Sequence, residues 1–173
     1  MTRRTVVTMA IVASLCLGAT LTTGSAVLHQ ASLKDQILGT WTAVAVNNIL
    51  EDGSKVQSYG PSPNGVLMLD AQGYFSLVLI RSDLFKFASS NRDTGTPEEN
   101  QAVVQGSIAN YGTYSLNDAD RTLVLRIHNS SFPNWRGTEQ KRIIAAISQH
   151  ELKWLNPAAS NGGTAQIVWK RMK

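Results

Sequence analysis

Residues 66–81 read VLMLDAQGYFSLVLIR, which is two apolar runs on either side of the polar segment DAQG. Strand-forming runs joined by a short turn of this composition predict a β-hairpin. In the second run Phe75, Leu77 and Leu79 alternate with residues that are themselves mostly apolar. A sheet with one face in water would normally show one polar face. We therefore predict a closed barrel with an apolar interior and an outer wall that is partly covered.

The same pattern extends along most of the chain. Short turns rich in Asp, Asn and Gly separate the apolar runs, which favours adjacent antiparallel strands. The expected strands are 40–50, 66–70, 74–81, 108–117, 122–128, 140–148, 151–156 and 164–172, with a further short one at 55–59. The predicted fold class is all-β: an antiparallel up-and-down barrel of about eight or nine strands.

Two helices are expected beside the strands. Ser32 is a candidate N-cap for a short helix over 32–38. The segment 82–105 is too long for a hairpin turn and contains Thr96-Pro97-Glu98-Glu99, in which Glu99 completes a capping box. This predicts an inserted helix that runs to about residue 106 and covers an end or a side of the barrel. The helix, or a second subunit in a homodimer, is the expected cover for the outer wall.

The first 26 residues resemble a secretory signal. Arg3 and Arg4 precede an apolar run over 6–21, and small residues end at Ala26. We predict cleavage after Ala26, a lead-in with the short helix at 27–37, and a barrel domain at 38–173. An uncleaved anchor is the alternative, but the run is shorter than the roughly 20 residues of a spanning helix. The expected location is outside the cytoplasm, either periplasmic or secreted.

Removal of the signal changes the composition of the mature chain. The single cysteine, Cys16, leaves with it, so no disulfide is expected. The formal charge of +4 falls by two with Arg3 and Arg4. This charge is too small for a nucleic-acid partner. No other apolar stretch is long enough for a stable membrane span.

Several segments resemble, in order, the bacterial and fungal lipocalin-like domain family, a branch of the calycin barrels. Gly39-Thr40-Trp41 is similar to the signature that opens lipocalin barrels, and Trp169-Lys170-Arg171 matches the basic residue that packs across that Trp. The other matching segments are GPSPNG at 60–65, DAQGYFS at 70–76, NYGTY at 110–114 and HNSSFPNWRG at 128–137.

The resemblance covers 38–171 and implies that Gly39, Trp41, Trp169 and Arg171 close the barrel. Pairing of the first and last strands requires such a contact, and a guanidinium stacked on indole is worth about 0.5 to 2 kcal/mol. The resemblance implies a fold more than an activity. Some relatives bind small hydrophobic molecules, and others catalyse cyclisations or isomerisations.

The segment 128–142 holds most of the candidate binding residues. Trp135 is positioned to lid a cavity, while His128 and Arg142 are candidates to contact a ligand carbonyl or carboxylate, with Asn134 between them. The alternative is that residues 133–137 form a tight turn whose Trp135 plugs the barrel, while Arg142 pairs with an acidic neighbour.

Three further residues are candidates for the cavity. Tyr74 and Tyr111 offer hydroxyls for orienting a ligand, although core packing is the alternative role of such tyrosines. Arg81 is a candidate anion contact, with a charge on the barrel rim as its alternative.

The sequence offers little for hydrolysis or metal binding. It has no Gly-x-Ser-x-Gly motif, and strand geometry places Ser130 and Ser131 poorly for a pair with His128. His29, His128 and His150 are scattered. We therefore predict no catalytic triad, no metal and no cofactor.

The leading prediction is an exported carrier or sensor that binds a small hydrophobic molecule in the barrel. One alternative is a cofactor-free isomerase or cyclase that uses the barrel as a template, with His128, Tyr111 and Arg142 as its polar groups. Another is a structural or partner-binding envelope protein whose barrel is filled by side chains.

Overall fold

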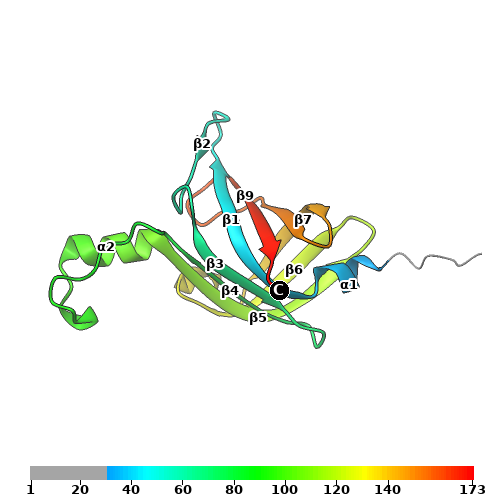
Figure 1. Cartoon of the computed structure of the whole chain (residues 1–173), viewed down its shortest axis with the longest axis horizontal. Helices are drawn as coiled ribbons and strands as arrows, with labels where there is room; N and C mark the ends of the chain where they lie inside the picture. The colour runs from blue at the N-terminus through cyan, green and yellow to red at the C-terminus, as the bar shows by residue number, and fades with distance from the viewer. Residues whose placement is uncertain (1–30) are drawn as a thin grey trace, which may run out of the picture. The chain divides into compact units, whose positions relative to one another are not determined.

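The computed structural model describes residues 31–173; the predicted signal peptide, Cys16 and His29 lie outside the described residues. Within them one antiparallel sheet holds all strands (Figure 1). The strands are β1 (Gly39–Ile49), β2 (Lys55–Val56), β3 (Asn64–Leu69), β4 (Tyr74–Ile80), β5 (Ser107–Asn117), β6 (Thr122–Ser130), β7 (Glu139–Ile147), β8 (Glu151–Asn156) and β9 (Thr164–Arg171).

The sheet closes into a barrel because its first and last long strands pair. Neighbours follow the order β1-β3-β4-β5-β6-β7-β8-β9, and β9 pairs back onto β1 with Trp41 opposite Arg171. The short strand β2 pairs only with the end of β1. The predicted up-and-down barrel is therefore confirmed, with β2 as an extra strand that is shorter than the expected 55–59.

Alternation decides which side chains enter the barrel. In β4, Phe75, Leu77 and Leu79 are buried while Tyr74 and Ile80 are exposed. Successive side chains of a strand point to opposite faces, so the buried set faces inward. The alternation shifts where β1, β5 and β7 carry register irregularities.

The two expected helices are present. α1 (Leu33–Ile37) begins after Ser32, whose Oγ accepts a hydrogen bond from the Asp35 amide at 3.1 Å. α2 (Pro97–Gly106) begins with the predicted capping box. Short 3₁₀ turns occur at Arg92–Thr94 and Pro133–Trp135. No helix within residues 31–173 is long and apolar enough to cross a lipid bilayer.

The position of α2 differs from the expectation that it covers the outer wall. The helix extends away from the barrel, and its last turn lies at one barrel end (Figure 1). On the outer wall Met68, Tyr74 and Tyr111 are 51%, 55% and 53% exposed. Because α2 extends away from the barrel, it does not cover this apolar surface, which stays exposed among residues 31–173.

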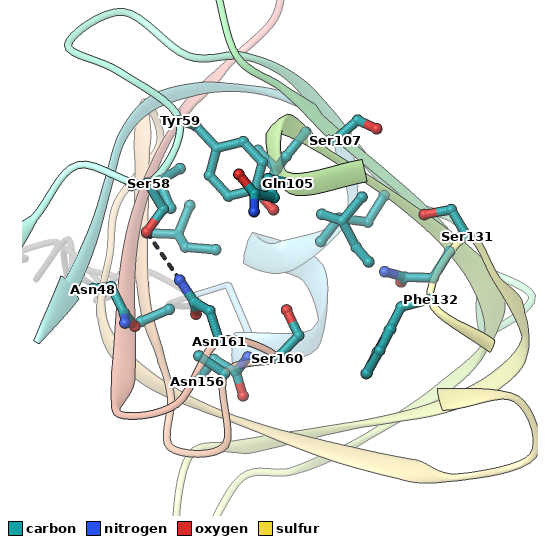
Figure 2. A pocket seen from close by; sticks show the side chains of 18 of the residues that line it. Asn48, Ser58, Tyr59, Gln105, Ser107, Ser131, Phe132, Asn156, Ser160 and Asn161 are labelled. Carbon is teal, nitrogen blue, oxygen red and sulfur yellow. Dashed lines mark hydrogen bonds between the residues drawn. The ribbon is translucent and has the colours of Figure 1, made fainter. Parts of the chain in front are cut away.

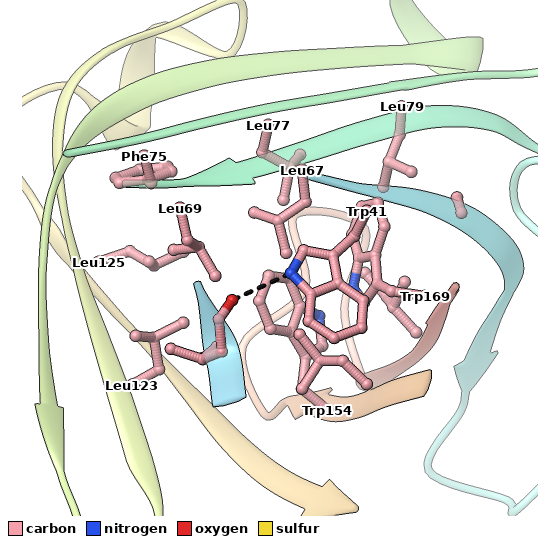
Figure 3. Packing of buried hydrophobic residues seen from close by; sticks show 14 of the residues in the cluster. Trp41, Leu67, Leu69, Phe75, Leu77, Leu79, Leu123, Leu125, Trp154 and Trp169 are labelled. Atoms are coloured by element: carbon pink, nitrogen blue, oxygen red, sulfur yellow. Dashed lines mark hydrogen bonds between the residues drawn. The ribbon is translucent and has the colours of Figure 1, made fainter. Parts of the chain in front are cut away.

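The barrel end next to α1 is closed by Trp41 and Arg171. The Trp41 indole N–H donates to the carbonyl of Ile37 at 3.0 Å (Figure 3). The Arg171 Cζ lies 3.9 Å from the centre of the Trp41 ring. The Arg171 guanidinium also donates to the carbonyls of Gln36, Leu38 and Gln149. One side chain thereby ties together α1, β1, the turn before β8 and β9.

Gly39 permits this arrangement. Its φ of +119° lies in a region that L side chains rarely adopt, and a Cβ there would lie 2.8 Å from the Arg171 Nη1. Beyond the closing pair, Trp154 and Trp169 are fully buried and meet edge to face at 5.4 Å between ring centroids. Side chains therefore fill this half of the barrel.

Candidate functional site

The opposite half of the barrel is hollow. A cavity of about 660 Å³ lies there, and its inner wall is apolar, formed by Val46, Leu77, Leu79, Ile108 and Ile167. These side chains come from β1, β4, β5 and β9 and continue the inward-facing rows that fill the closed half. The cavity lies within the range of about 300–1,000 Å³ that is typical of small-molecule sites.

The β6–β7 connection with Phe132 and Trp135 and three further connections form the mouth of the cavity. The further three are the segment after β2 with Ser58 and Tyr59, the last turn of α2, and the β8–β9 loop with Asn161. Asn161 Nδ2 donates to Ser58 Oγ at 3.2 Å, which links two of these connections (Figure 2). Figure 2 shows the labelled side chains arranged around an open centre. The barrel therefore has one closed end and one mouth.

Four polar side chains are buried in the cavity wall. Asn48, Asn110, Asn156 and Arg142 are 2%, 4%, 5% and 3% exposed, and all four line the cavity. Each stands two residues from an inward apolar residue, as Asn156 does from Trp154. Asn48 and Asn156 both pair with Ala165 of β9, so β1, β9 and β8 bring them to one level of the barrel.

Hydrogen bonds satisfy only part of this polar set. Arg142 Nη1 donates to Asn156 Oδ1 at 2.9 Å and to the Lys141 carbonyl at 2.8 Å. Asn48 Nδ2 donates to the Gly162 carbonyl at 2.9 Å, but Asn48 Oδ1 has no partner among residues 31–173. The same holds for both side-chain polar atoms of Asn110. Buried polar groups in proteins normally have partners, so these orphan atoms are unusual.

Arg142 carries its charge without an acidic partner. Among the described residues no carboxylate oxygen lies within ion-pairing distance of it, whereas Arg81 pairs with Asp83 and Arg126 pairs with Glu139. Burial lowers the pKa of Arg142 to about 10 because the protein replaces the water that would stabilise the cation. The group is still charged at neutral pH. The side chain that Arg142 contacts is the amide of Asn156, and not the acidic residue of the alternative prediction.

The sequence of the barrel matches the model of a known family. The lipocalin-like domain model covers residues 38–172. This chain belongs to the lipocalin-like domain family. The family resemblance predicted from the sequence is therefore confirmed.

Two solved structures resemble this lipocalin-like protein. One is a lipocalin-like protein from Bacteroides uniformis, with 14% sequence identity, a TM-score of 0.44, and coverage of 79% of this chain and 99% of that chain. The other is a redesigned β-barrel, with 14% identity, a TM-score of 0.42, and coverage of 83% of this chain and 100% of that chain. No curated protein matches the sequence.

Among the predicted site residues, Arg142, Trp135 and Arg81 line the cavity of the lipocalin-like barrel. Trp135 lies at the mouth, half-buried, with its ring edge to face against Phe132 at 5.8 Å between centroids. Arg81 forms a two-point ion pair with Asp83, at 2.7 and 2.9 Å. The charge of Arg81 is therefore compensated at the rim, in contrast to that of Arg142.

The other predicted residues lie outside the cavity. Asn134 is exposed on the turn before Trp135. Tyr74 is exposed on the outer wall, and Tyr111 and His128 meet there edge to face at 6.3 Å between ring centroids. Their predicted contact with a ligand inside the barrel is corrected. Tyr74, Tyr111 and His128 each lie one residue out of phase with the inward row of their strand, and Asn134 lies on an exposed 3₁₀ turn.

The same geometry bears on the predicted enzyme. A cofactor-free isomerase or cyclase was expected to use His128, Tyr111 and Arg142 around one cavity. Only Arg142 faces the cavity, so the barrel does not bring these three groups together. Within residues 31–173 no group of three or more His, Cys, Asp or Glu side chains is arranged to bind a metal ion.

The three buried asparagines and Tyr59 are cavity residues that were not predicted from the sequence. Asn110 immediately precedes Tyr111, and a two-residue count from Ile108 would have placed it inward. Asn156 follows from Trp154 in the same way. Asn48 was harder to place, because the irregularity between Ala43 and Ala45 interrupts the alternation of β1. Burial raises the pKa of the Tyr59 phenol to about 12, so it stays protonated at the cavity mouth.

Proposed function

We propose that this lipocalin-like protein binds a small hydrophobic molecule in its barrel cavity and serves as a carrier or sensor. The observation that carries the proposal is the hollow half of the barrel, about 660 Å³ with an apolar wall and one mouth. Binding is favourable when an apolar ligand replaces water at an apolar wall, by roughly 25 cal/mol per Å² of apolar surface buried.

A barrel filled by its own side chains is the competing role, and the cavity argues against it. The closed half shows that this fold can be packed, since Trp41, Trp154 and Trp169 fill it completely. An unfilled cavity costs stability, at about 24 cal/mol per Å³ in well-packed cores. The presence of small and medium side chains such as Ala165 and Val46 around the mouth half supports a space kept for a ligand.

We also propose that the protein acts outside the cytoplasm after removal of residues 1–26. The support is the sequence of this segment: two arginines, an apolar run and small residues before position 27. N-terminal sequencing of the protein from periplasm and culture medium tests this. A mature N-terminus near Val27 is expected, and a chain that retains Met1 in the cytoplasm would contradict it.

Binding of an uncharged, environment-sensitive dye tests the proposed cavity function. Nile red should show saturable fluorescence enhancement with one site per barrel. Ala165→Phe places a ring in the cavity and should weaken dye binding by about tenfold or more. Ala109→Phe adds the same ring on the exposed outer wall and should leave binding unchanged. Absence of saturable binding to the unaltered protein would count against the proposal.

A further inference from the structure

The cavity wall of this protein contains a positively charged side chain that no acidic side chain among the described residues neutralises. Arg142 is 3% exposed and lines the cavity, yet no carboxylate among residues 31–173 pairs with it. A buried charge is expensive unless it is paired and hydrogen-bonded. An apolar side chain at this place would serve a purely structural barrel better, so the cation points to a partner that comes from outside the chain.

The hydrogen bonds of Arg142 leave one edge of its guanidinium group without a hydrogen-bond partner among the described residues. Within the described residues its two hydrogen bonds, to Asn156 and to the Lys141 carbonyl, both come from Nη1. The Nε and Nη2 groups therefore remain, and this edge of a guanidinium presents two parallel N–H donors. Such a fork matches the two oxygens of a carboxylate.

Three buried asparagines add polar groups to the cavity wall. Asn110 has a buried side-chain amide with neither atom satisfied, and Asn48 retains an unsatisfied Oδ1. Asn156 lies against Arg142, and Asn48 shares its level through Ala165. Orphan amide groups of this kind are costly when empty and useful when a ligand supplies partners.

We propose that the molecule bound in the cavity is an amphiphile with a single carboxylate head, held by Arg142 with Asn156 beside it, and an apolar body against the inner wall. This inference rests on the proposed binding function and specifies its ligand class. The head lies at Arg142 and Asn156, and the tail lies against the inward apolar side chains of Leu77, Leu79 and Ile167. A neutral molecule of the same length would leave the cation uncompensated.

The test compares an acid with the alcohol of the same chain length. Dodecanoate and dodecan-1-ol are titrated as competitors of bound Nile red at neutral pH, below the concentration of micelle formation. On the unaltered protein dodecanoate should displace the dye about 10- to 100-fold more effectively, because charge-assisted hydrogen bonds contribute on that scale. Equal potency of acid and alcohol would overturn the inference.

Two variants locate the effect at Arg142. Arg142→Met should remove the preference for the acid, measured as the ratio of the potencies of dodecanoate and dodecan-1-ol on the same variant. Arg142→Lys keeps a charge but loses the fork, so the preference should fall to an intermediate value. Arg126→Met is the matched control, since it removes an equivalent charge from the outer wall. An acid preference that survives in Arg142→Met would also overturn the inference.

Failure of this inference and failure of the proposed function look different. If Nile red and dodecan-1-ol bind but the acid has no advantage, the cavity binds apolar molecules and the carboxylate assignment is wrong. If no probe binds to the unaltered protein, the binding function itself fails. The comparison on the unaltered protein decides the inference even if Arg142→Met does not fold.

Discussion

The buried side chain of Arg142 lowers the stability of the barrel. Burial lowers the pKa of Arg142 to about 10, which corresponds to a penalty of roughly 3 kcal/mol on the charged form. The hydrogen bonds from Nη1 to Asn156 and Lys141 offset part of this penalty. An arginine with a structural role would be compensated more fully, as Arg171 is by three carbonyls and an indole ring.

Arg142→Met should therefore stabilise the unliganded protein. The unfolding free energy, measured by urea denaturation, should rise by about 1 kcal/mol or more, as when buried charged groups are replaced by apolar ones of similar size. Asn156 Oδ1 keeps the Ala158 amide as a donor, so the substitution does not leave it unpaired. Arg126→Met, on the surface, should change the value by less than about 0.5 kcal/mol. A loss of stability in Arg142→Met would assign Arg142 a structural role.

Tyr59 gives the protein an alkaline stability limit. Burial raises its pKa to about 12 from an ordinary value of 10.0, so the folded state holds its proton longer than the unfolded state. The resulting stabilisation is complete below pH 10 and is lost as the pH rises toward 12. Over that interval the unaltered protein should lose unfolding free energy faster than Tyr59→Phe, by urea denaturation at a series of pH values. Parallel pH profiles would show that the Tyr59 phenol is not desolvated.

Among the elements, the insertion between β4 and β5 depends on one buried carboxylate. Glu99 is 7% exposed, and its two oxygens accept hydrogen bonds from the amides of Ala88 and Thr96, each at 2.8 Å. It thus joins the loop before α2 to the start of the helix. The last turn of this helix borders the cavity mouth.

Glu99→Ala should loosen this insertion without unfolding the barrel. Loss of the capping box and of the Ala88 contact costs about 1 to 2 kcal/mol locally, so amide hydrogen exchange over 84–106 should accelerate by about tenfold. Exchange in β6 to β9 should not change. Glu98→Ala, at the exposed neighbouring position, is the control. Uniform acceleration across the barrel would show that the insertion and the barrel unfold together.

For the whole molecule, closure of the barrel is concentrated at one contact. Arg171 lies on the last strand, stacks on Trp41 of the first, and holds the C-terminal end of α1 through the Gln36 and Leu38 carbonyls. Because β1 and β9 are far apart in the sequence, their pairing must offset a large loop-closure entropy. The stacking and hydrogen bonds of Arg171 stabilise the barrel where β9 pairs with β1.

Arg171→Ala should lower the unfolding free energy by about 2 to 4 kcal/mol, because it removes a cation–π contact and three hydrogen bonds to carbonyls. Arg171→Lys keeps a charge above the ring but cannot reach all three acceptors, so its loss should be smaller. Thermal and urea unfolding measure both. If Arg171→Ala is as stable as the unaltered protein, barrel closure depends on strand pairing and the tryptophan core alone.

Local patterns in the sequence determined the strands, the two helices and their caps. Two-residue alternation, turn composition and a capping box act between near neighbours, so Thr96-Pro97-Glu98-Glu99 and the 66–81 hairpin were predictable without tertiary information. The closing pair of Trp41 and Arg171 was predictable because it forms part of a recurring family pattern.

The cavity and its polar patch depended on the tertiary structure. Local rules place a residue on one face of a strand, but register irregularities in β1, β5 and β7 shift that face, and only closure decides what lies across the barrel. Asn48 lies beyond the irregularity in β1, and the partner of Arg142, Asn156, comes from another strand, so neither placement follows from local alternation. Asn110 precedes the irregularity in β5, and a two-residue count from Ile108 does place it inward. Burial and pairing are properties of the closed cylinder, since they arise from strands that are distant in the sequence.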